Sequence, residues 1–209
     1  MPKRSITYGV AAGSTVPALY LLYRMRVSGK ENLPEDGFVL AAGHVSRFDP
    51  WPLAVPLWPR REIRFMAKAE LYNPVLAPIL TRMQAFPVQR EEADRNAFRR
   101  AVEYARAGEI VGMFPEGTRR AKGSRRQFDA QPHDGAVRIA LRAGVPLVPA
   151  AISGTDRLLR FSAIRVVYGE PVPLDDLQGL DRRTLARAAT DRLMVTIAEL
   201  EESLRPGPE

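Results

Sequence analysis

The sequence predicts an α/β fold with a mixed, largely parallel sheet flanked by helices. Short apolar segments that read as buried strands alternate along the chain with segments of helical periodicity. This alternation is typical of strand–helix–strand units, whose strands run parallel. Of the 209 residues, 45% are hydrophobic, which is enough to bury one core, and the chain is too short for two full domains.

The first element is an uncharged segment, residues 5–23. The residues that flank it are basic: Lys3, Arg4, Arg24 and Arg26. As a helix it would be about 28 Å long, close to the thickness of the hydrocarbon core of a bilayer. Several glycines dilute its apolar character, and Pro17 should kink a helix.

Four interpretations of this segment compete: a secretory signal, a full membrane span, an ordinary core element, and a helix that enters one leaflet. A signal is disfavoured because arginines stand where a small-residue cleavage site should lie. We favour the last, with Tyr20 and Tyr23 near the headgroups and the basic flanks on the cytoplasmic side. The expected organisation is a membrane-associating segment at 1–24 and an α/β domain at 25–209.

The expected strands of the domain are apolar runs bounded by glycine, proline or charged residues. They are Arg24–Ser28, Gly37–Ala42, Glu62–Ala67, Ala85–Val88, Ile110–Phe114, Val145–Ile152 and Ala163–Tyr168. Val145–Ile152 contains Pro146 and Pro149, and proline is poorly tolerated in the centre of a sheet. We therefore expect this strand at an edge or against a pocket.

The expected helices show start signals, stop signals or a helical repeat. Asp49 and Pro50 look like the N-cap and first residue of one helix. The clearest is Ala93–Ala107, where alanine recurs every fourth residue and Gly108 follows as the stop. The others are Pro74–Met83, His133–Ala143, which Gly144 closes, and Asp181–Leu204.

Composition limits the chemistry. The absence of cysteine excludes disulfides, a thiolate nucleophile and cysteine-based metal sites. With only two histidines, His44 and His133, a histidine-rich metal site is nearly excluded. The net charge of +7 indicates polyanionic partners such as a membrane surface, phosphorylated small molecules or nucleic acid.

A histidine and an aspartate follow the buried strand Gly37–Ala42. His44 and Asp49 are five residues apart and would not share a face of a helix, so they can meet only across a loop. In that arrangement the carboxylate holds one imidazole nitrogen, and the other nitrogen can take a proton from a substrate hydroxyl. The competing interpretation is that Asp49 only caps the following helix.

A second polar block, Phe114-Pro115-Glu116-Gly117-Thr118-Arg119, follows another apolar strand. Arginine binds phosphate with two hydrogen bonds, and Thr118 and the Gly117 backbone can donate to the same group. It could also be a simple strand-to-loop turn. Sites in parallel sheets gather beyond the carboxyl ends of strands, where both blocks lie.

Taken together in this order, the motifs resemble the glycerolipid acyltransferase family over about Met25–Ile152. They are His-x4-Asp, an arginine after a short strand (Arg90), Phe-Pro-Glu-Gly-Thr-Arg, and Val-Pro-x-Val-Pro at 145–149. The resemblance implies transfer of a fatty acyl group from a thioester donor to the free hydroxyl of 1-acyl-glycerol-3-phosphate, giving phosphatidate.

The resemblance also implies roles for residues. His44 is the general base and Asp49 orients it. Direct attack of the hydroxyl on the thioester needs no covalent acyl-enzyme. The substrate-binding residues are Arg90, Glu116, Gly117, Thr118 and Arg119, with Arg119 on the phosphate, and Pro146 matches the block near the acyl donor.

The implied partners are a lysophospholipid acceptor, acyl-CoA or acyl carrier protein as co-substrate, and the lipid surface at the cytoplasmic face of the cell membrane, with no nucleic acid and no cofactor. Gly43 and Arg47 depart from the family pattern. They leave open another lysophospholipid or a glycolipid as the acceptor. A non-catalytic basic protein that binds membranes or polyanions is the alternative of another class.

Overall fold

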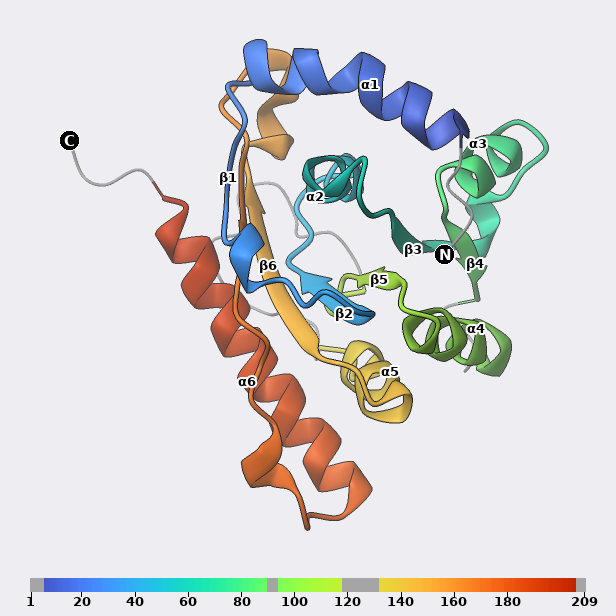
Figure 1. Ribbon diagram of the computed structural model, residues 1–209, viewed down its shortest axis with the longest axis vertical. Coiled ribbons are helices and arrows are strands. Elements are labelled where there is room, and N and C mark those ends of the chain that lie inside the picture. The colour runs from blue at the N-terminus through green and yellow to red at the C-terminus, as the bar shows by residue number, and fades with distance from the viewer. Residues whose placement is uncertain (1–5, 90–93, 118–131, 206–209) are drawn as a thin grey trace.

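The computed structural model describes residues 6–89, 94–117 and 132–205, and a seven-stranded sheet forms its centre (Figure 1). The strands are β1 (Arg26–Ser28), β2 (Phe38–Ala42), β3 (Ile63–Lys68), β4 (Phe86–Val88), β5 (Ile110–Met113), β6 (Leu147–Ser153) and β7 (Arg165–Tyr168). Their order is β1-β7-β6-β2-β5-β3-β4. The described pairs are parallel except β6 with β7, which is antiparallel. The predicted mixed, largely parallel α/β fold is confirmed.

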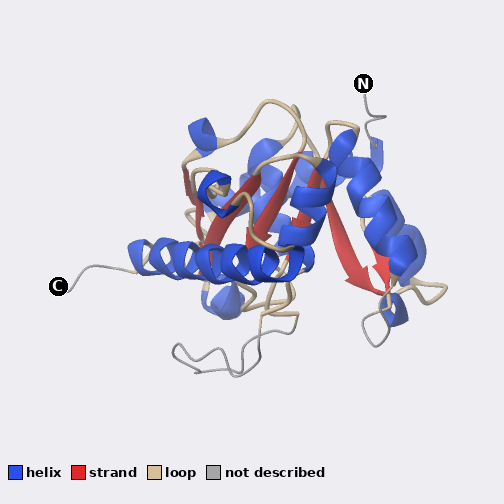
Figure 2. Ribbon diagram, turned by 90° about the horizontal axis from the view of Figure 1, so that it is seen from below, coloured by secondary structure: helices blue, strands red, loops and turns tan. Residues whose placement is uncertain are grey.

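Helices cover both faces of the sheet (Figures 1 and 2). They are α1 (Ile6–Leu21), α2 (Pro50–Ala54), α3 (Leu76–Arg82), α4 (Arg95–Arg106), α5 (Gly135–Ala143) and α6 (Arg182–Ser203). Buried residues of α1 and α2 belong to one hydrophobic cluster, and those of α4, α5 and α6 belong to another. The sheet therefore separates two cores, and the short α3 lies beside β4 at its edge (Figure 1).

The strand β2 shows why the sheet is parallel at its centre. Phe38 and Leu40 point into the core beneath α1 and α2, whereas Val39 and Ala41 point into the other core. All five residues of the strand are buried. A strand with both faces covered reads as a continuous apolar run, and each large side chain buried this way contributes about 1.5–3 kcal/mol to folding.

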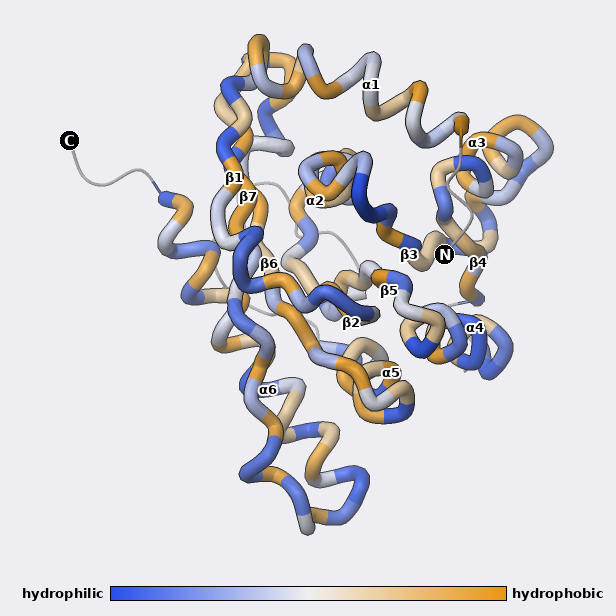
Figure 3. Tube along the Cα trace, viewed as in Figure 1, coloured by the Kyte–Doolittle hydropathy of each residue, from blue (hydrophilic) through white to orange (hydrophobic). Residues whose placement is uncertain are grey.

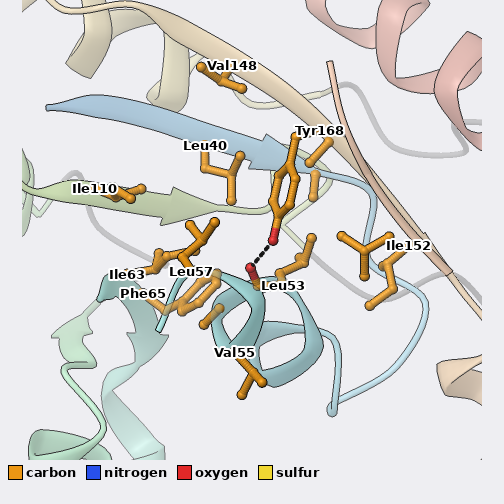
Figure 4. Close-up of a cluster of buried hydrophobic side chains, with 14 of the residues drawn as sticks. Leu40, Leu53, Val55, Leu57, Ile63, Phe65, Ile110, Val148, Ile152 and Tyr168 are labelled. Carbon is orange, nitrogen blue, oxygen red and sulfur yellow. Dashed lines mark hydrogen bonds between the residues drawn. The ribbon is translucent and has the colours of Figure 1, made fainter. Parts of the chain in front are cut away.

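A hydrogen bond also lies within the core beneath α1 and α2 (Figure 4). The buried hydroxyl of Tyr168 donates a hydrogen bond of 2.7 Å to the backbone oxygen of Leu53. The contact fixes the end of β7 to α2, the helix that follows the loop after β2. Burial raises the pKa of Tyr168 above its ordinary value.

Of the two alternatives expected for Val145–Ile152, a sheet edge or an end against a pocket, the edge is wrong, because β6 lies between β7 and β2. Pro146 precedes the strand. Pro149 lies outside the β6–β7 pairs, which run from Ala150 to Ser153. The Pro149 oxygen accepts from Gly169 N at 2.9 Å, so the proline nitrogen also points to the β7 side, past the end of that ladder. The proline nitrogen, which cannot donate, therefore lies where the short β7 ladder ends and not on the side that pairs with β2.

The N-terminal segment is a helix, as predicted, and it continues through Pro17 to Leu21. One side of α1 is part of the core: Tyr8, Ala12 and Leu19 are buried. The other side and the end of the helix are exposed and apolar, with Ile6, Val10, Leu21 and Leu22 between 56% and 86% exposed. Within the described ranges, none of the helices has both the length and the apolar character needed to cross a bilayer.

Candidate active site

The loop between β2 and α2 brings His44 and Asp49 together. The Nδ1 atom of His44 lies 2.9 Å from Oδ2 of Asp49. The loop begins with Gly43 and His44, directly after the end of β2, and ends at Asp49, directly before Pro50 starts α2. The predicted meeting of the two side chains across a loop is confirmed.

Asp49 is completely buried, and hydrogen-bond donors surround its carboxylate. Oδ2 also accepts from the backbone N–H groups of Val45 and Ser46, at 2.8 Å each. Oδ1 accepts from the hydroxyl of Thr155 at 2.5 Å. These donors offset the cost of burying the charge and hold both carboxylate oxygens in place.

The helix start at Pro50 is as predicted, but the expected capping role of the Asp49 side chain is wrong. Asp49 makes no side-chain hydrogen bond to the first turn of α2. Its backbone is already helical, with φ −50° and ψ −40°, whereas a capping residue normally has an extended backbone that turns its side chain toward the helix. The carboxylate therefore points back into the loop toward His44.

This contact fixes the tautomer of His44. A carboxylate can only accept hydrogen bonds, so the Nδ1 atom carries the hydrogen and donates it to Asp49. The lone pair on Nε2 is then available to a substrate hydroxyl. The His44 side chain is 14% exposed, so the ring is shielded on most sides and still reachable.

Phe114 joins the second sequence block to this pair. Its ring stacks on the imidazole of His44 with centroids 4.1 Å apart and planes at 22°. Phe65 in turn stacks on Phe114, and the centroids of these two rings are 5.8 Å apart. Because β5 runs parallel to β2, the turn after β5 and the loop after β2 leave the same edge of the sheet.

The turn after Phe114 is tightly packed. Gly117 has φ +67° and donates to the oxygen of Phe114 at 3.0 Å, and His133 N donates to the oxygen of Pro115 at 2.8 Å. A Cβ atom on Gly117 would lie 2.6 Å from the ring of His133. Glu116 is buried. Glycine at this position therefore serves both the left-handed backbone and the close approach of the imidazole.

Of the other predicted site residues, the structure describes only Pro146 and not the two arginines or the threonine. Arg90, Thr118 and Arg119 lie outside the described residues. Pro146 is exposed at the amino end of β6, where its oxygen accepts from Val39 N at 3.0 Å. His44 follows the carboxyl end of the parallel neighbour β2, so the structure does not bring Pro146 to the His44–Asp49 pair.

Sequence reasoning missed two residues of this site, Phe114 as a partner of the imidazole and Thr155. Thr155 follows the carboxyl end of β6, which runs parallel to β2. A polar residue at that strand end is a signal that could have placed it near His44. In the described part of the chain, no three histidine, aspartate or glutamate side chains gather in a way that could hold a metal ion.

Among known protein families, a family model described as Acyltransferase matches residues 24–153 of this chain. The chain is 35% identical to a 1-acyl-sn-glycerol-3-phosphate acyltransferase of Bacillus subtilis (strain 168), over 94% of this chain and 98% of that protein. It is 28% identical to a chloroplastic enzyme of the same name from Brassica napus, over 74% of this chain and 47% of that protein.

Among solved structures, the 1-acyl-sn-glycerophosphate (LPA) acyltransferase PlsC from Thermotoga maritima shares the fold, with a TM-score of 0.63. The match covers 99% of this chain and 85% of that chain, at 23% sequence identity.

Proposed function

Since this chain belongs to the acyltransferase family, we propose that it transfers a fatty acyl group from a thioester donor to the free hydroxyl of 1-acyl-sn-glycerol-3-phosphate. The observation that carries the proposal is the His44–Asp49 contact of 2.9 Å, with the ring stacked on Phe114 at the start of the Pro-Glu-Gly-Thr-Arg turn. This contact supports the proposal because the loop that carries the proposed base and the turn that begins the proposed acceptor-binding block leave the same edge of the sheet. The relative from Bacillus subtilis, aligned over nearly its whole length, bears the name of this activity.

The proposed reaction needs one proton-transfer group and no covalent enzyme intermediate. Nε2 of His44 takes the proton from the acceptor hydroxyl as its oxygen attacks the thioester carbonyl. The C–O bond forms, the C–S bond breaks, and the proton passes from the imidazolium to the departing thiolate. The buried carboxylate of Asp49 stabilises the positive charge that the ring carries between these steps.

The acceptor brings a phosphate, and the turn after β5 is the proposed place for it. Arg119 and Thr118, which follow Gly117 directly, would donate to the phosphate oxygens, with Arg90 as a further cation. Pro146 stays a proposed donor-side residue on the resemblance alone. The donor would be acyl-CoA or acyl carrier protein. Both offer a thiol leaving group, so substrates held in near-attack geometry need little more than a base.

An acceptor panel tests this function. Purified full-length protein in vesicles is given palmitoyl-CoA, and free thiol and labelled lipid are both measured with lysophosphatidate, lysophosphatidylcholine, a monoacylated glycolipid or no acceptor. We expect thiol release only with lysophosphatidate, matched by phosphatidate formation. Release without an acceptor would indicate a thioesterase, and a preference for an acceptor that lacks a phosphomonoester would refute the assigned substrate.

We also propose that α1 binds the cytoplasmic face of the cell membrane without crossing it. The residues that follow its C-terminal end lie beside the end of η4 (Thr155–Arg160), since the rings of Tyr23 and Phe161 have centroids 5.7 Å apart. Leu159 is 98% exposed and Phe161 is 54% exposed. In Figure 3 both the C-terminal end of α1 and this neighbouring segment include hydrophobic stretches.

Four basic residues lie close in the sequence to the exposed apolar residues at the end of α1 and at η4. They are Arg24, Arg26, Arg157 and Arg160. Apolar side chains that enter a leaflet beside arginines that contact lipid phosphates are typical of interfacial membrane binding. A lysophospholipid acceptor resides in the membrane, so this placement would bring the enzyme to its substrate.

A further inference from the structure

Thr155 is distant from the two motifs in the sequence and yet contacts the reacting pair. Its hydroxyl donates to Oδ1 of Asp49 at 2.5 Å, and its side chain is 2% exposed. It lies beyond residues 24–153, which the family model matches. The contact joins the end of β6 to the loop after β2.

The backbone places this hydroxyl with little freedom. Gly154 directly before it has φ +88°, and a Cβ atom there would lie 2.2 Å from the backbone oxygen of Ala163. Only glycine suits that position, because an L side chain would face both the unfavourable φ and the clash. The tight turn therefore directs Thr155 from the end of β6 into the interior beside Asp49.

The two oxygens of Asp49 have different partners. Oδ2 receives the Nδ1–H of His44 and two backbone N–H groups, all from its own loop. Oδ1 is bonded by the Thr155 hydroxyl, which comes from another strand. The donors to Oδ2 belong to the same loop as Asp49, so they do not fix the carboxylate relative to the rest of the protein. The Thr155 bond ties the carboxylate plane to the central sheet and also spreads its negative charge.

We propose that Thr155 is a positioning residue for acyl transfer. By holding Oδ1 of Asp49, it fixes the carboxylate that orients and charges the imidazole of His44. The proposal rests on the proposed function for its link to catalysis, but the link from Thr155 through Asp49 to His44 can be measured without a substrate. Ionisable residues on the segments that carry these contacts are Arg47 in the loop, Glu116 and His133 at the turn after β5, and Asp156 next to Thr155.

Three variants of the full chain test it. Thr155→Val keeps the shape and removes the hydroxyl, and Thr155→Ser restores the hydroxyl. Thr190→Val is the matched control, because Thr190 is also buried but its hydroxyl donates within its own helix α6, to Ala186 O at 2.7 Å. The readouts are kcat, KM, the melting temperature, the pH–rate profile and the NMR titration of His44. The chain has only two histidines, which simplifies the NMR assignment.

We expect Thr155→Val to lower kcat about tenfold or more with little change in KM, because a buried acceptor is left without its donor. The released carboxylate no longer holds the imidazole as it does in the wild type, so the acid limb of the profile and the NMR midpoint of His44 should both shift away from their wild-type values. Thr155→Ser should restore wild-type values, and Thr190→Val should leave kcat and both pH values unchanged, because the Thr190 hydroxyl donates within α6.

An unchanged NMR midpoint in Thr155→Val, or no rescue by serine, would overturn the proposal. So would an equal loss of kcat in Thr190→Val. If the wild-type protein shows no acyl transfer at all, the proposed function fails, while the NMR titration still decides whether Thr155 controls the His44–Asp49 pair.

Discussion

At the scale of single residues, Asp49 determines how the site is built. Its position before Pro50 indicated a helix cap, and the His-x4-Asp spacing indicated a partner for His44. The structure has only the second contact, together with the Thr155 bond that no local pattern contains. The spacing could predict the pair because both residues lie in one loop. The tertiary partners Phe114 and Thr155 could not be read from it, since strand order brings them in.

Asp49→Asn is the most informative change in the carboxylate. The amide has the same shape, and its NH2 group can donate to Thr155 while its oxygen still accepts from the loop. The charge that stabilises the imidazolium is lost. We expect kcat to fall by about a hundredfold or more while the melting temperature changes little. Steady-state kinetics and thermal unfolding check this. A large drop in melting temperature with kcat near wild type would assign Asp49 a purely structural role.

Gly117 offers a second residue-scale prediction with a matched control. Gly117→Ala should destabilise the fold by more than Gly108→Ala. Both glycines have positive φ, but only at Gly117 would the new Cβ atom meet the His133 ring, at 2.6 Å. Strained φ costs about 1–3 kcal/mol in each variant, and the clash adds to it. Denaturant unfolding measures both.

The clash can be removed separately. In a protein that already carries His133→Ala, Gly117→Ala should lower the free energy of unfolding by no more than Gly108→Ala does in the wild type. An unchanged cost would mean that the imidazole moves aside freely and that the turn is not held by this contact.

At the level of elements, periodicity and punctuation predicted each α-helix and strand that the structure describes in the α/β domain to within a few residues, but none of the short 3-10 helices. The position of β6 is a further exception, since a sheet edge was one of its two expected places. The sequence shows where prolines lie but not which side of a strand each one faces. Pro149 points past the end of the β7 ladder, so a central strand tolerates it. For the acceptor-binding block, Arg90, Thr118 and Arg119 remain predictions from the sequence.

The two sides of α1 should respond differently to mutation. Leu21→Glu with Leu22→Glu should reduce binding to anionic vesicles, because both side chains are exposed and apolar, and leave the melting temperature unchanged. Leu19→Ala should lower stability by about 2–5 kcal/mol, because Leu19 is packed in the core, and leave vesicle binding intact. Vesicle sedimentation and thermal unfolding measure the two effects. Undiminished sedimentation of the double glutamate variant would contradict the membrane role of α1.

For the whole molecule, ionisable side chains whose pKa values change on folding determine the pH range of stability. Hydrogen bonds from the backbone of Ala97 and Gln89 lower the pKa of Asp94, and the Arg192 guanidinium lowers that of Asp176. A lowered carboxyl pKa gives stability that is present above the unfolded value of about 4 and is lost as the pH falls below it. Burial raises the pKa of Tyr168, which gives stability that is lost as the pH rises past the unfolded value of about 10.

Thermal unfolding across pH should therefore show a plateau at neutral pH with losses below about 4 and above about 10. Tyr168→Phe should lower the plateau by about 1–3 kcal/mol, because the buried Leu53 oxygen loses its donor. The same variant should make the alkaline loss shallower. An alkaline limb as steep as that of the wild type would show that ionisation of Tyr168 does not limit stability there.

Acyl transfer to lysophosphatidate by wild type and by His44→Ala, with thermal unfolding of both proteins, decides whether His44 is the base. His44 is partly exposed, and Phe114 and Asp49 can pack around an alanine, so the variant should fold. If His44 is the base, the variant loses nearly all transfer while keeping a melting temperature close to that of the wild type. A folded variant that retains more than a few per cent of the wild-type rate would show that His44 is not the base.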